Sequence, residues 1–349
     1  MAVRRPNWKK IGLGFLSIAL FILSIQLMKE GASVVAPYIQ GWLHIDNPLN
    51  SLGFGWLSAY VILSGSPVAA VALTFYDTGI IGQLEALTMI SGSRLGASFI
   101  VLFIGFIYVL RGHERLTGLS MGLLSFVITT FLHLPGLVIG YLLLANGIAD
   151  HIRLQSGAAF TSIIELLFDP IINLVVHNTP GWMAFVIGAG MVLVSFSLLD
   201  RALPELHLEN TQFGGVSRVI YRPIVMFLVG LVVTALCMSV SISLGILVPL
   251  SARGYIRSEN AIAYIMGANV STFIDTLLVA LLLNNPQATA VVLVQIASIS
   301  IVSLFVMGLL YTPYERVVLR LTSAIGGSTR NLVIFAATIL MVPVILMLL

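Results

Sequence analysis

The chain has 349 residues, of which 58% are hydrophobic and 9% are charged, and its formal net charge is +3. One globular core cannot hide that much apolar surface, so the composition predicts an integral membrane protein in contact with lipid. The basic residues are not gathered on one stripe, which argues against a nucleic-acid partner. The single cysteine, Cys237, excludes an internal disulfide, and the six histidines show no spacing typical of a metal site.

The chain begins with a basic segment that leads into an apolar one. Four Lys and Arg residues, the last of them Lys10, precede uncharged residues 11–28, and no convincing small-residue cleavage site occurs before Pro37. These features predict a retained first helix whose amino end lies in the cytoplasm. The short loops between later segments favour a prokaryotic inner (plasma) membrane.

Long runs without Asp, Glu, Lys or Arg follow, and most exceed the roughly 20 residues that one spanning helix needs. They cover residues 47–76, 116–149, 170–199, 223–252, 276–314 and 331–349. We expect about eight to ten hydrophobic segments in total. Lys and Arg residues are scattered over many connections and leave the topology open.

Two short polar patterns recur, one in each half of the chain. In the first half, residues 64–66 (Ser-Gly-Ser) lie 28 positions before residues 92–96 (Gly-Ser-Arg-Leu-Gly). In the second half, residues 239–241 (Ser-Val-Ser) lie 28 positions before residues 267–271 (Gly-Ala-Asn-Val-Ser). The two copies are 175 positions apart, about half of the chain. Duplicated halves with interrupted hydrophobic segments are typical of transporters that bind their substrate between the repeats. The pattern predicts an all-α, polytopic membrane protein with two inverted repeats and broken or re-entrant helices.

The transmembrane repeats are expected to occupy residues 1–150 and 181–349. Residues 151–180 mix apolar and charged side chains, which predicts an interfacial linker segment. In hydrocarbon, non-helical backbone survives only beside protein or a polar cavity, so glycine and proline within apolar runs point to a site. We therefore expect helix breaks at Gly65, Pro67, Gly92, Gly96, Pro135, Gly136, Pro249, Gly267 and residues 284–286.

These motifs resemble those of the type II sodium/phosphate cotransporter family, whose repeats each carry a Gln-Ser-Ser-Ser segment followed by Gly-Ala/Thr-Asn-Ile-Gly-Thr-Thr. Residues 267–272 match the second segment well, and residues 92–98 match it weakly. Residues 63–66 and 238–241 correspond to the first segment but lack its glutamine and middle serine. The resemblance implies sodium-coupled symport of inorganic phosphate by alternating access at a midplane site, with Na+ as the coupling ion.

Hydroxyl groups and unwound backbone carbonyls can coordinate sodium, while the N-termini of half-helices attract anions. On this basis the expected substrate-binding residues are Ser64, Ser66, Ser93, Arg94, Ser239, Ser241 and Asn269. The expected cation-binding residues are Ser98, Ser271, Thr272 and Asp275.

Arg94 departs most from the family pattern, because it places a permanent charge where the family and its own duplicate, Asn269, have an amide. A charge at the centre of a membrane costs about 3 kcal/mol on insertion scales, so Arg94 needs a cavity or a partner. Asp275 is the expected counter-charge. Two roles remain open: Arg94 binds a phosphate-like anion through its planar fork, or it forms a structural pair that replaces a coupling ion.

Other polar residues are expected to be structural. Asp77 and Glu85 flank a turn and are expected at a solvated tip, His133 is expected to be a structural histidine, and Gln295 is expected to bond between helices. The chain has no Walker loop, nucleophile elbow or metal-binding pair, so it is not expected to be an enzyme. Two alternatives to phosphate symport are transport of another small anion or organic acid on the same fold, and a non-transporting membrane scaffold or sensor with a degenerate site. The oligomeric state is left open.

Overall fold

The computed structural model of the protein describes residues 8–42, 45, 47–110, 115–154, 157–202, 222–252 and 256–349. Nearly all of this part of the chain is helical and none of it forms a strand, which confirms the predicted all-α class. Seven of the described helical segments are long and apolar enough to cross a membrane, and Pro223–Cys237 is a shorter apolar helix. The protein is therefore an integral membrane protein with several spans.

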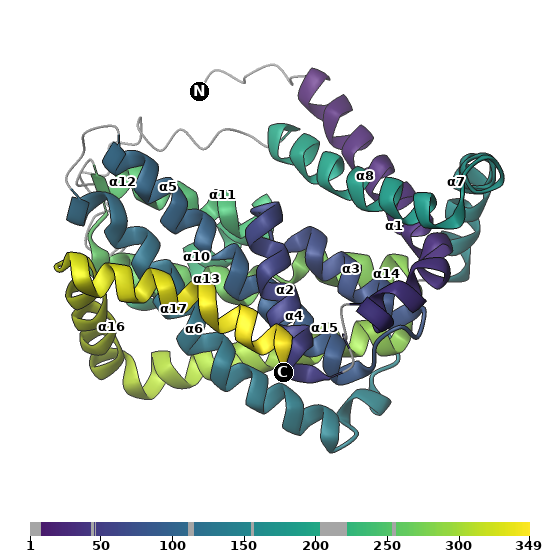
Figure 1. Cartoon of the computed structure of the whole chain (residues 1–349). Helices are drawn as coiled ribbons and strands as arrows, with labels where there is room; N and C mark the ends of the chain where they lie inside the picture. Colours follow the sequence, from purple (N-terminus) through teal and green to yellow (C-terminus); the bar gives the residue numbers. More distant parts are fainter. Residues whose placement is uncertain are drawn as a thin grey trace.

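The first half of the chain supplies both long and short helices (Figure 1). In chain order they are α1 (Trp8–Trp42), α2 (Pro48–Ile62), α3 (Ser66–Asp77), α4 (Gln83–Ala97), α5 (Phe99–Leu110), α6 (Arg115–Ala145), a 3-10 helix (Ile148–His151) and α7 (Ala158–Asn178). Helix α1 is longer than the predicted residues 11–28. The expected break at Pro135 and Gly136 is absent, because α6 continues through both residues.

The second half supplies the remaining helices. They are α8 (Gly181–Ala202), α10 (Pro223–Cys237), α11 (Val240–Gly245), α12 (Leu247–Ala252), α13 (Ser258–Ser271), α14 (Ile274–Leu282), α15 (Pro286–Phe305), a π-helical segment (Val306–Leu310), α16 (Tyr311–Gly326) and α17 (Thr329–Leu348). Pro249 lies within α12 rather than at a break, whereas the break expected at residues 284–286 is present, since residues 283–285 separate α14 from α15.

Helices α1 and α8, the opening helices of the two predicted repeats, lie side by side at one edge of the molecule (Figure 1). Their backbones approach closely, because a Cβ on Gly188 would lie 2.8 Å from the backbone nitrogen of Met28. The pair packs on α3 through Phe185, whose ring stacks on that of Phe75 with the centroids 5.5 Å apart. The opening helices thus form one unit against the body of the protein.

The two halves share local geometry at the same offset of 175 residues. Helices α2 and α10 both end in a left-handed residue, Leu63 with φ 55° and Met238 with φ 49°. A Cβ on Gly92 of α4 would collide with the carbonyl oxygen of Leu52, and the equivalent Gly267 of α13 faces the carbonyl oxygen of Phe227 in the same way. The helix pairs α2–α4 and α10–α13 are therefore built alike, whereas the inverted orientation of the repeats stays a prediction.

These contacts correct the role expected for the glycines. Helices α4 and α13 run unbroken through Gly92, Gly96 and Gly267, so the prediction that these residues interrupt their helices is wrong. The glycines instead let two helix backbones touch, as small residues do between membrane helices. The breaks lie just beyond, after Ala97 and after Ser271.

Substitution of Gly267 by alanine is expected to destabilise the protein by about 1–3 kcal/mol, because helices α10 and α13 must separate to admit the methyl group. Thermal unfolding of the purified protein in detergent, followed by tryptophan fluorescence, measures the loss. Gly190 of α8 has nothing within 4 Å of an added Cβ, so Gly190→Ala is the matched control and should unfold as the wild type does. Equal midpoints for both variants would contradict the close packing of α10 and α13.

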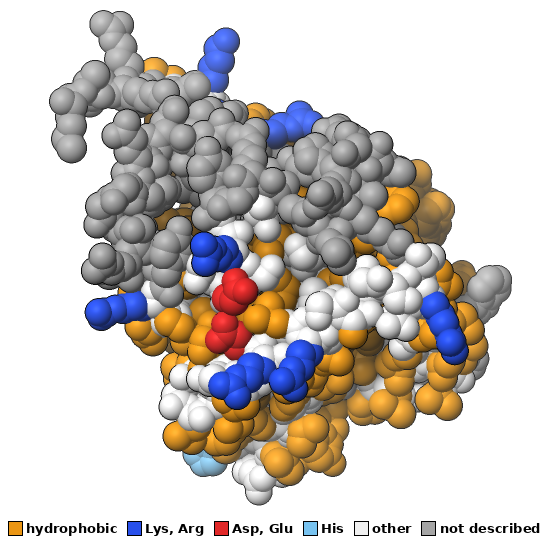
Figure 2. Space-filling model, turned by 90° about the vertical axis from the view of Figure 1, so that its left-hand side faces the viewer, with side chains coloured by type: hydrophobic (Ala, Val, Ile, Leu, Met, Phe, Trp, Pro, Cys, Tyr) orange, Lys and Arg blue, Asp and Glu red, His pale blue; other side chains and the backbone are white. Residues whose placement is uncertain are grey.

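Apolar side chains cover much of the outer surface, as lipid contact requires. Leu236 of α10, Leu166 of α7 and Leu348 of α17 are 71%, 78% and 81% exposed. On the end of the molecule shown in Figure 2, basic and acidic side chains lie in a band beside hydrophobic ones. Such a boundary between charged and apolar surface is what a membrane–water interface produces.

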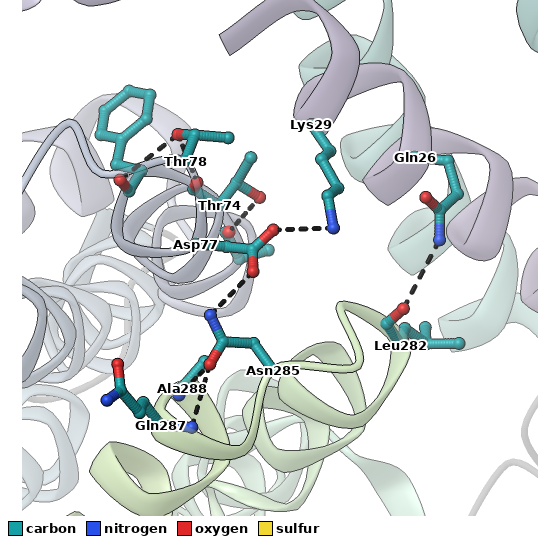
Figure 3. Close-up of polar contacts among 11 residues, drawn as sticks. Gln26, Lys29, Thr74, Asp77, Thr78, Leu282, Asn285, Gln287 and Ala288 are labelled. Atoms are coloured by element: carbon teal, nitrogen blue, oxygen red, sulfur yellow. Dashed lines mark hydrogen bonds and ion pairs between the residues drawn. The ribbon is translucent and has the colours of Figure 1, made fainter. Parts of the chain in front are cut away.

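A polar junction ties α1 to both halves of the chain (Figure 3). The Lys29 Nζ atom of α1 lies 3.0 Å from Asp77 Oδ2 at the end of α3, and Asn285 Nδ2, before α15, donates to Asp77 Oδ1 at 2.8 Å. The Asp77 side chain is only 7% exposed, so its expected place at a solvated tip is wrong. Gln26 adds a bond of 3.4 Å from Nε2 to the carbonyl oxygen of Leu282.

Candidate functional site

The centre of the protein holds a buried ion pair between the two halves. Arg94 Nη2 lies 2.9 Å from Asp275 Oδ1, and the side chains are only 4% and 3% exposed. The hydroxyl of Thr276 accepts a second bond from the same nitrogen and donates to Asp275 Oδ1 at 2.9 Å. The expected counter-charge of Arg94 is therefore present in the structure.

Helix breaks position this pair. Arg94 lies in the last turn of α4, and Asp275 lies in the first turn of α14, just after the break that follows α13. Arg94 Nη1 donates to the hydroxyl of Ser66 at 3.4 Å, and Ser66 is the first residue of α3, after the break that follows α2. Three interrupted helices thus converge on one guanidinium group.

Aromatic and polar contacts continue from Arg94 to α6. The Arg94 Cζ atom lies 5.2 Å from the ring centroid of Phe273, a distance at which a cation and a π-system attract. The ring of His133 lies 5.9 Å from that of Phe273, and its Nδ1 donates to the carbonyl oxygen of Thr129 at 3.0 Å. The Thr129 hydroxyl in turn donates to Asn269 Oδ1 at 3.2 Å.

Several predicted hydroxyl ligands are engaged within their own helices. Ser93 and Ser98 donate to the carbonyl oxygens of Ile90 and Leu95 at 2.7 and 2.6 Å. Ser271 approaches the carbonyl oxygens of Gly267 and Ala268, each at 3.4 Å. A donating hydroxyl keeps its lone pairs, so these three residues can accept further bonds but have no free proton.

The predicted serines of the helix breaks differ between the halves. Ser64 is half-buried in the break between α2 and α3. Ser239 caps α11 by accepting a bond of 3.3 Å from the backbone nitrogen of Ile242. The side chain of Ser241 lies outside the described part of the structure. Asn269 Nδ2 donates one N–H to the carbonyl oxygen of Ile265 at 2.8 Å, and its Oδ1 accepts from Thr129, so its second N–H can still donate to a ligand.

Four buried polar atoms around the ion pair have no partner: Arg94 Nε, Asp275 Oδ2, Thr272 Oγ1 and His133 Nε2. An unsatisfied buried donor or acceptor costs about 1–3 kcal/mol, and more when it is charged. A buried group without a partner in a native structure calls for an explanation, of which a bound ion or water molecule is one. The free atoms include an N–H donor on the Arg94 guanidinium and an acceptor oxygen on the Asp275 carboxylate. The pair can therefore bind both an anion and a cation.

A crevice beside α1 and α8 has Asp275 among its lining residues. It encloses about 310 Å³ of empty space, including its open mouth, and is lined by Ser17, Ile18, Phe21, Ser195, Phe196, Leu199, Met238, Asp275 and Leu278. Both serine hydroxyls donate within their own helices, at 2.7 Å to the carbonyl oxygens of Gly14 and Val192. Its walls are almost entirely apolar, so this crevice offers nothing to an anion.

Some residues of the site were not expected from the sequence. Thr276 and Phe273 lie close to Asp275 in the sequence. Thr129 and His133 lie on α6, which carries neither of the two repeated motifs. Their signal is weak, because single hydroxyl and aromatic residues are common in membrane helices. Gln295 differs from its expected role, since both polar atoms of its buried amide lack a partner and no bond between helices forms.

The fold and site define a polytopic helical membrane protein with a buried charge pair between its halves. Residues 191–327 match the family model described as Na+/Pi-cotransporter, which confirms the predicted resemblance to sodium/phosphate cotransporters. The matched segment contains Asp275 and Asn269 but not Arg94. Comparisons with curated proteins and with solved structures gave no match.

Proposed function

We propose that the protein is a secondary active transporter that carries inorganic phosphate together with sodium, at the site around Arg94 and Asp275. The observation that carries this proposal is the buried ion pair with a free donor and a free acceptor, in a chain whose residues 191–327 match the sodium/phosphate cotransporter model. No part of the proposed reaction is enzymatic.

The anion is expected to bind at the guanidinium of Arg94. Its Nε atom is free, and a planar fork suits phosphate oxygens better than an ammonium does. The first residue of α3, Ser66, contacts the same guanidinium, and the first N–H groups of a helix have no partner within that helix. The positive end of α3 therefore adds to the attraction of Arg94 for an anion. Ser64, Ser93, Ser239, Ser241 and Asn269 stay proposed as further substrate-binding residues.

The cation is expected to bind at the free oxygen of Asp275. Thr272 supplies a second free oxygen three residues earlier, and the last carbonyl groups of α13 face the same break. Carboxylate, hydroxyl and carbonyl oxygens at the end of a half-helix are the usual ligands of sodium in transporters. Ser98 and Ser271 stay proposed as more distant members of the cation site.

Alternating access is the proposed mechanism. Arg94 comes from the proposed repeat 1 (residues 1–150) and Asp275 from repeat 2 (residues 181–349), with residues 151–180 as an interfacial linker. Rocking of one repeat against the other would open the pair to one side of the membrane at a time. We propose a prokaryotic inner membrane as the location.

Uptake of radiolabelled phosphate into proteoliposomes tests this proposal. An inward sodium gradient should accelerate uptake at least about tenfold over an equal potassium gradient, because the free energy of the sodium gradient adds to that of phosphate when the two ions move together. Competition by unlabelled sulfate or small carboxylates distinguishes phosphate from another anion. Absence of uptake of all these anions would contradict a transport function.

The closed state of the site supports one rival, a non-transporting scaffold or sensor. The Arg94 and Asp275 side chains are almost fully buried, and the crevice beside them has no anion-binding wall. A permanently closed pair would serve to fix the two halves together. Phosphate that fails to change the thermal midpoint of the purified protein, combined with absent uptake, would favour this rival.

A further inference from the structure

The polar junction of Figure 3 joins residues of the two proposed repeats. Asn285 Nδ2, from repeat 2, donates to Asp77 Oδ1, from repeat 1, at 2.8 Å. Beside it, the hydroxyl of Tyr76 donates to Gln287 Oε1 at 3.3 Å. The Asn285 side chain is held in place because its Oδ1 caps α15, accepting from the backbone nitrogen of Gln287 at 2.9 Å. Lys29 of α1 completes the junction through its ion pair with Asp77, so side chains tie the two halves together at this point.

The junction lies at the far ends of two helices that begin at the buried ion pair. Helix α3 begins with Ser66, which contacts Arg94, and ends with Asp77, about 16 Å further along its axis. Helix α14 carries Asp275 in its first turn, and Asn285 follows its end. The two helices, one from each proposed repeat, contact each other. The junction therefore holds them together between the ion pair and one end of the molecule.

The duplicated positions do not repeat the polar residues of this junction. At the offset of 175 residues, Asp77 corresponds to Ala252 and Asn285 to Leu110, whose side chains have no hydrogen-bonding group. Ala252 and Leu110 end α12 and α5, which lie at the opposite end of the molecule from α3 and α14 in Figure 1. The sequence therefore provides this polar pair at one end only.

The position of Lys29 on α1 indicates the face of the membrane to which the junction belongs. Lys29 lies 21 residues after Trp8, the first residue of α1, which is about 32 Å along the helix and close to the thickness of the hydrocarbon core. Because the amino end is expected in the cytoplasm, the junction is expected at the outer face. The crevice that includes Asp275 lies on the amino-terminal side of Lys29, since its α1 residues lie within residues 17–21.

We propose that Lys29, Asp77 and Asn285 form the outer gate of the transporter and that this gate is closed in the structure. The inference rests on the proposed transport function. The Lys29 side chain is 41% exposed, and an ion pair with a solvated partner contributes little to stability. Such a pair can open and close in each cycle, whereas the buried pair of Arg94 and Asp275 is costly to break. Opening of the gate separates the ends of α3 and α14 and gives an anion a path from outside to Arg94.

A reversible crosslink tests whether this gate must open. The double variant Asp77→Cys/Asn285→Cys is treated in proteoliposomes with a short bifunctional thiosulfonate, and sodium-dependent uptake of radiolabelled phosphate is measured before and after treatment. We expect the crosslink to lower uptake at least about tenfold, because the outward-facing state is no longer accessible, and a reductant to restore it. Glu165→Cys/Asp169→Cys, an exposed pair one turn apart on α7, is the matched control and should keep its uptake when crosslinked.

The outcomes separate the gate from the transport function. Unchanged uptake by the double variant, once mass spectrometry shows that the crosslink has formed, would overturn the gate and leave the transport function standing. Absence of uptake by the untreated wild type would instead contradict the transport function itself. Wild-type protein treated with the same reagent controls for the native Cys237, which is buried.

Thiol labelling tests the gate without transport. Ala70 is fully buried and lies on the same face of α3 as Ser66 and Asp77, between the ion pair and the gate. In right-side-out vesicles, we expect a membrane-impermeant maleimide to label Ala70→Cys/Asp77→Ala at least about fivefold faster than Ala70→Cys, because the weakened gate is open more often. Asp150 is an exposed acid near Tyr76, so Ala70→Cys/Asp150→Ala is the matched control and should label as Ala70→Cys does. Equal labelling rates for all three proteins would overturn the gate, and this measurement decides if the double cysteine variant does not fold or crosslink.

Discussion

Replacement of Arg94 by alanine is expected to lower sodium-dependent phosphate uptake about a hundredfold, which corresponds to about 3 kcal/mol of lost anion stabilisation. The substitution removes the one buried guanidinium of the described structure and leaves Asp275 without its partner. Proteoliposome uptake at fixed protein density measures the effect, and size-exclusion chromatography verifies that the variant is folded.

Two further variants separate charge from geometry. Arg94→Lys keeps the charge but loses the planar fork, so its uptake is expected between that of the wild type and that of Arg94→Ala. Arg330 is exposed in the first turn of α17, and Arg330→Ala should transport as the wild type does. Normal uptake by Arg94→Ala would end the proposed role of this residue in anion binding.

The sequence predicted the parts of the fold that depend on composition and on the repeat. Uncharged runs identified the membrane helices, and the offset of 175 residues also relates Leu63 to Met238, where α2 and α10 end in the same left-handed conformation. The prediction that Gly92 and Gly267 break their helices is wrong, because the sequence does not distinguish a glycine that breaks a helix from one that lets a neighbouring helix pack closely. Only the facing carbonyl groups of Leu52 and Phe227 distinguish the two cases.

The candidate site was predictable where electrostatics leaves little choice. A charge such as Arg94 in an apolar run needs an opposite charge, and Asp275 was the natural candidate in the other half. Thr276 and Phe273 were not predictable, because their roles depend on how the break after α13 turns the chain. The engagement of Ser93 and Ser98 by their own helices also depends on rotamers, which the sequence does not reveal.

The buried pair itself is expected to dominate the stability of the site. Breaking a buried ion pair by removing one partner typically costs about 3–5 kcal/mol, because the other charge is left uncompensated. We therefore expect Asp275→Leu and Arg94→Met each to lower the free energy of unfolding by about that amount. Unfolding titrations with sodium dodecyl sulfate in mixed micelles measure both losses.

The double variant Arg94→Met/Asp275→Leu is expected to lie within about 1–2 kcal/mol of the wild type, because replacing both partners by apolar residues of similar size removes the desolvation cost together with the attraction. The cycle of four proteins then isolates the coupling between the two side chains. Strictly additive losses would show that the two side chains act independently. A stable double variant that no longer carries phosphate would instead separate the two roles of the pair, since the fold would be retained while the ligand atoms are gone.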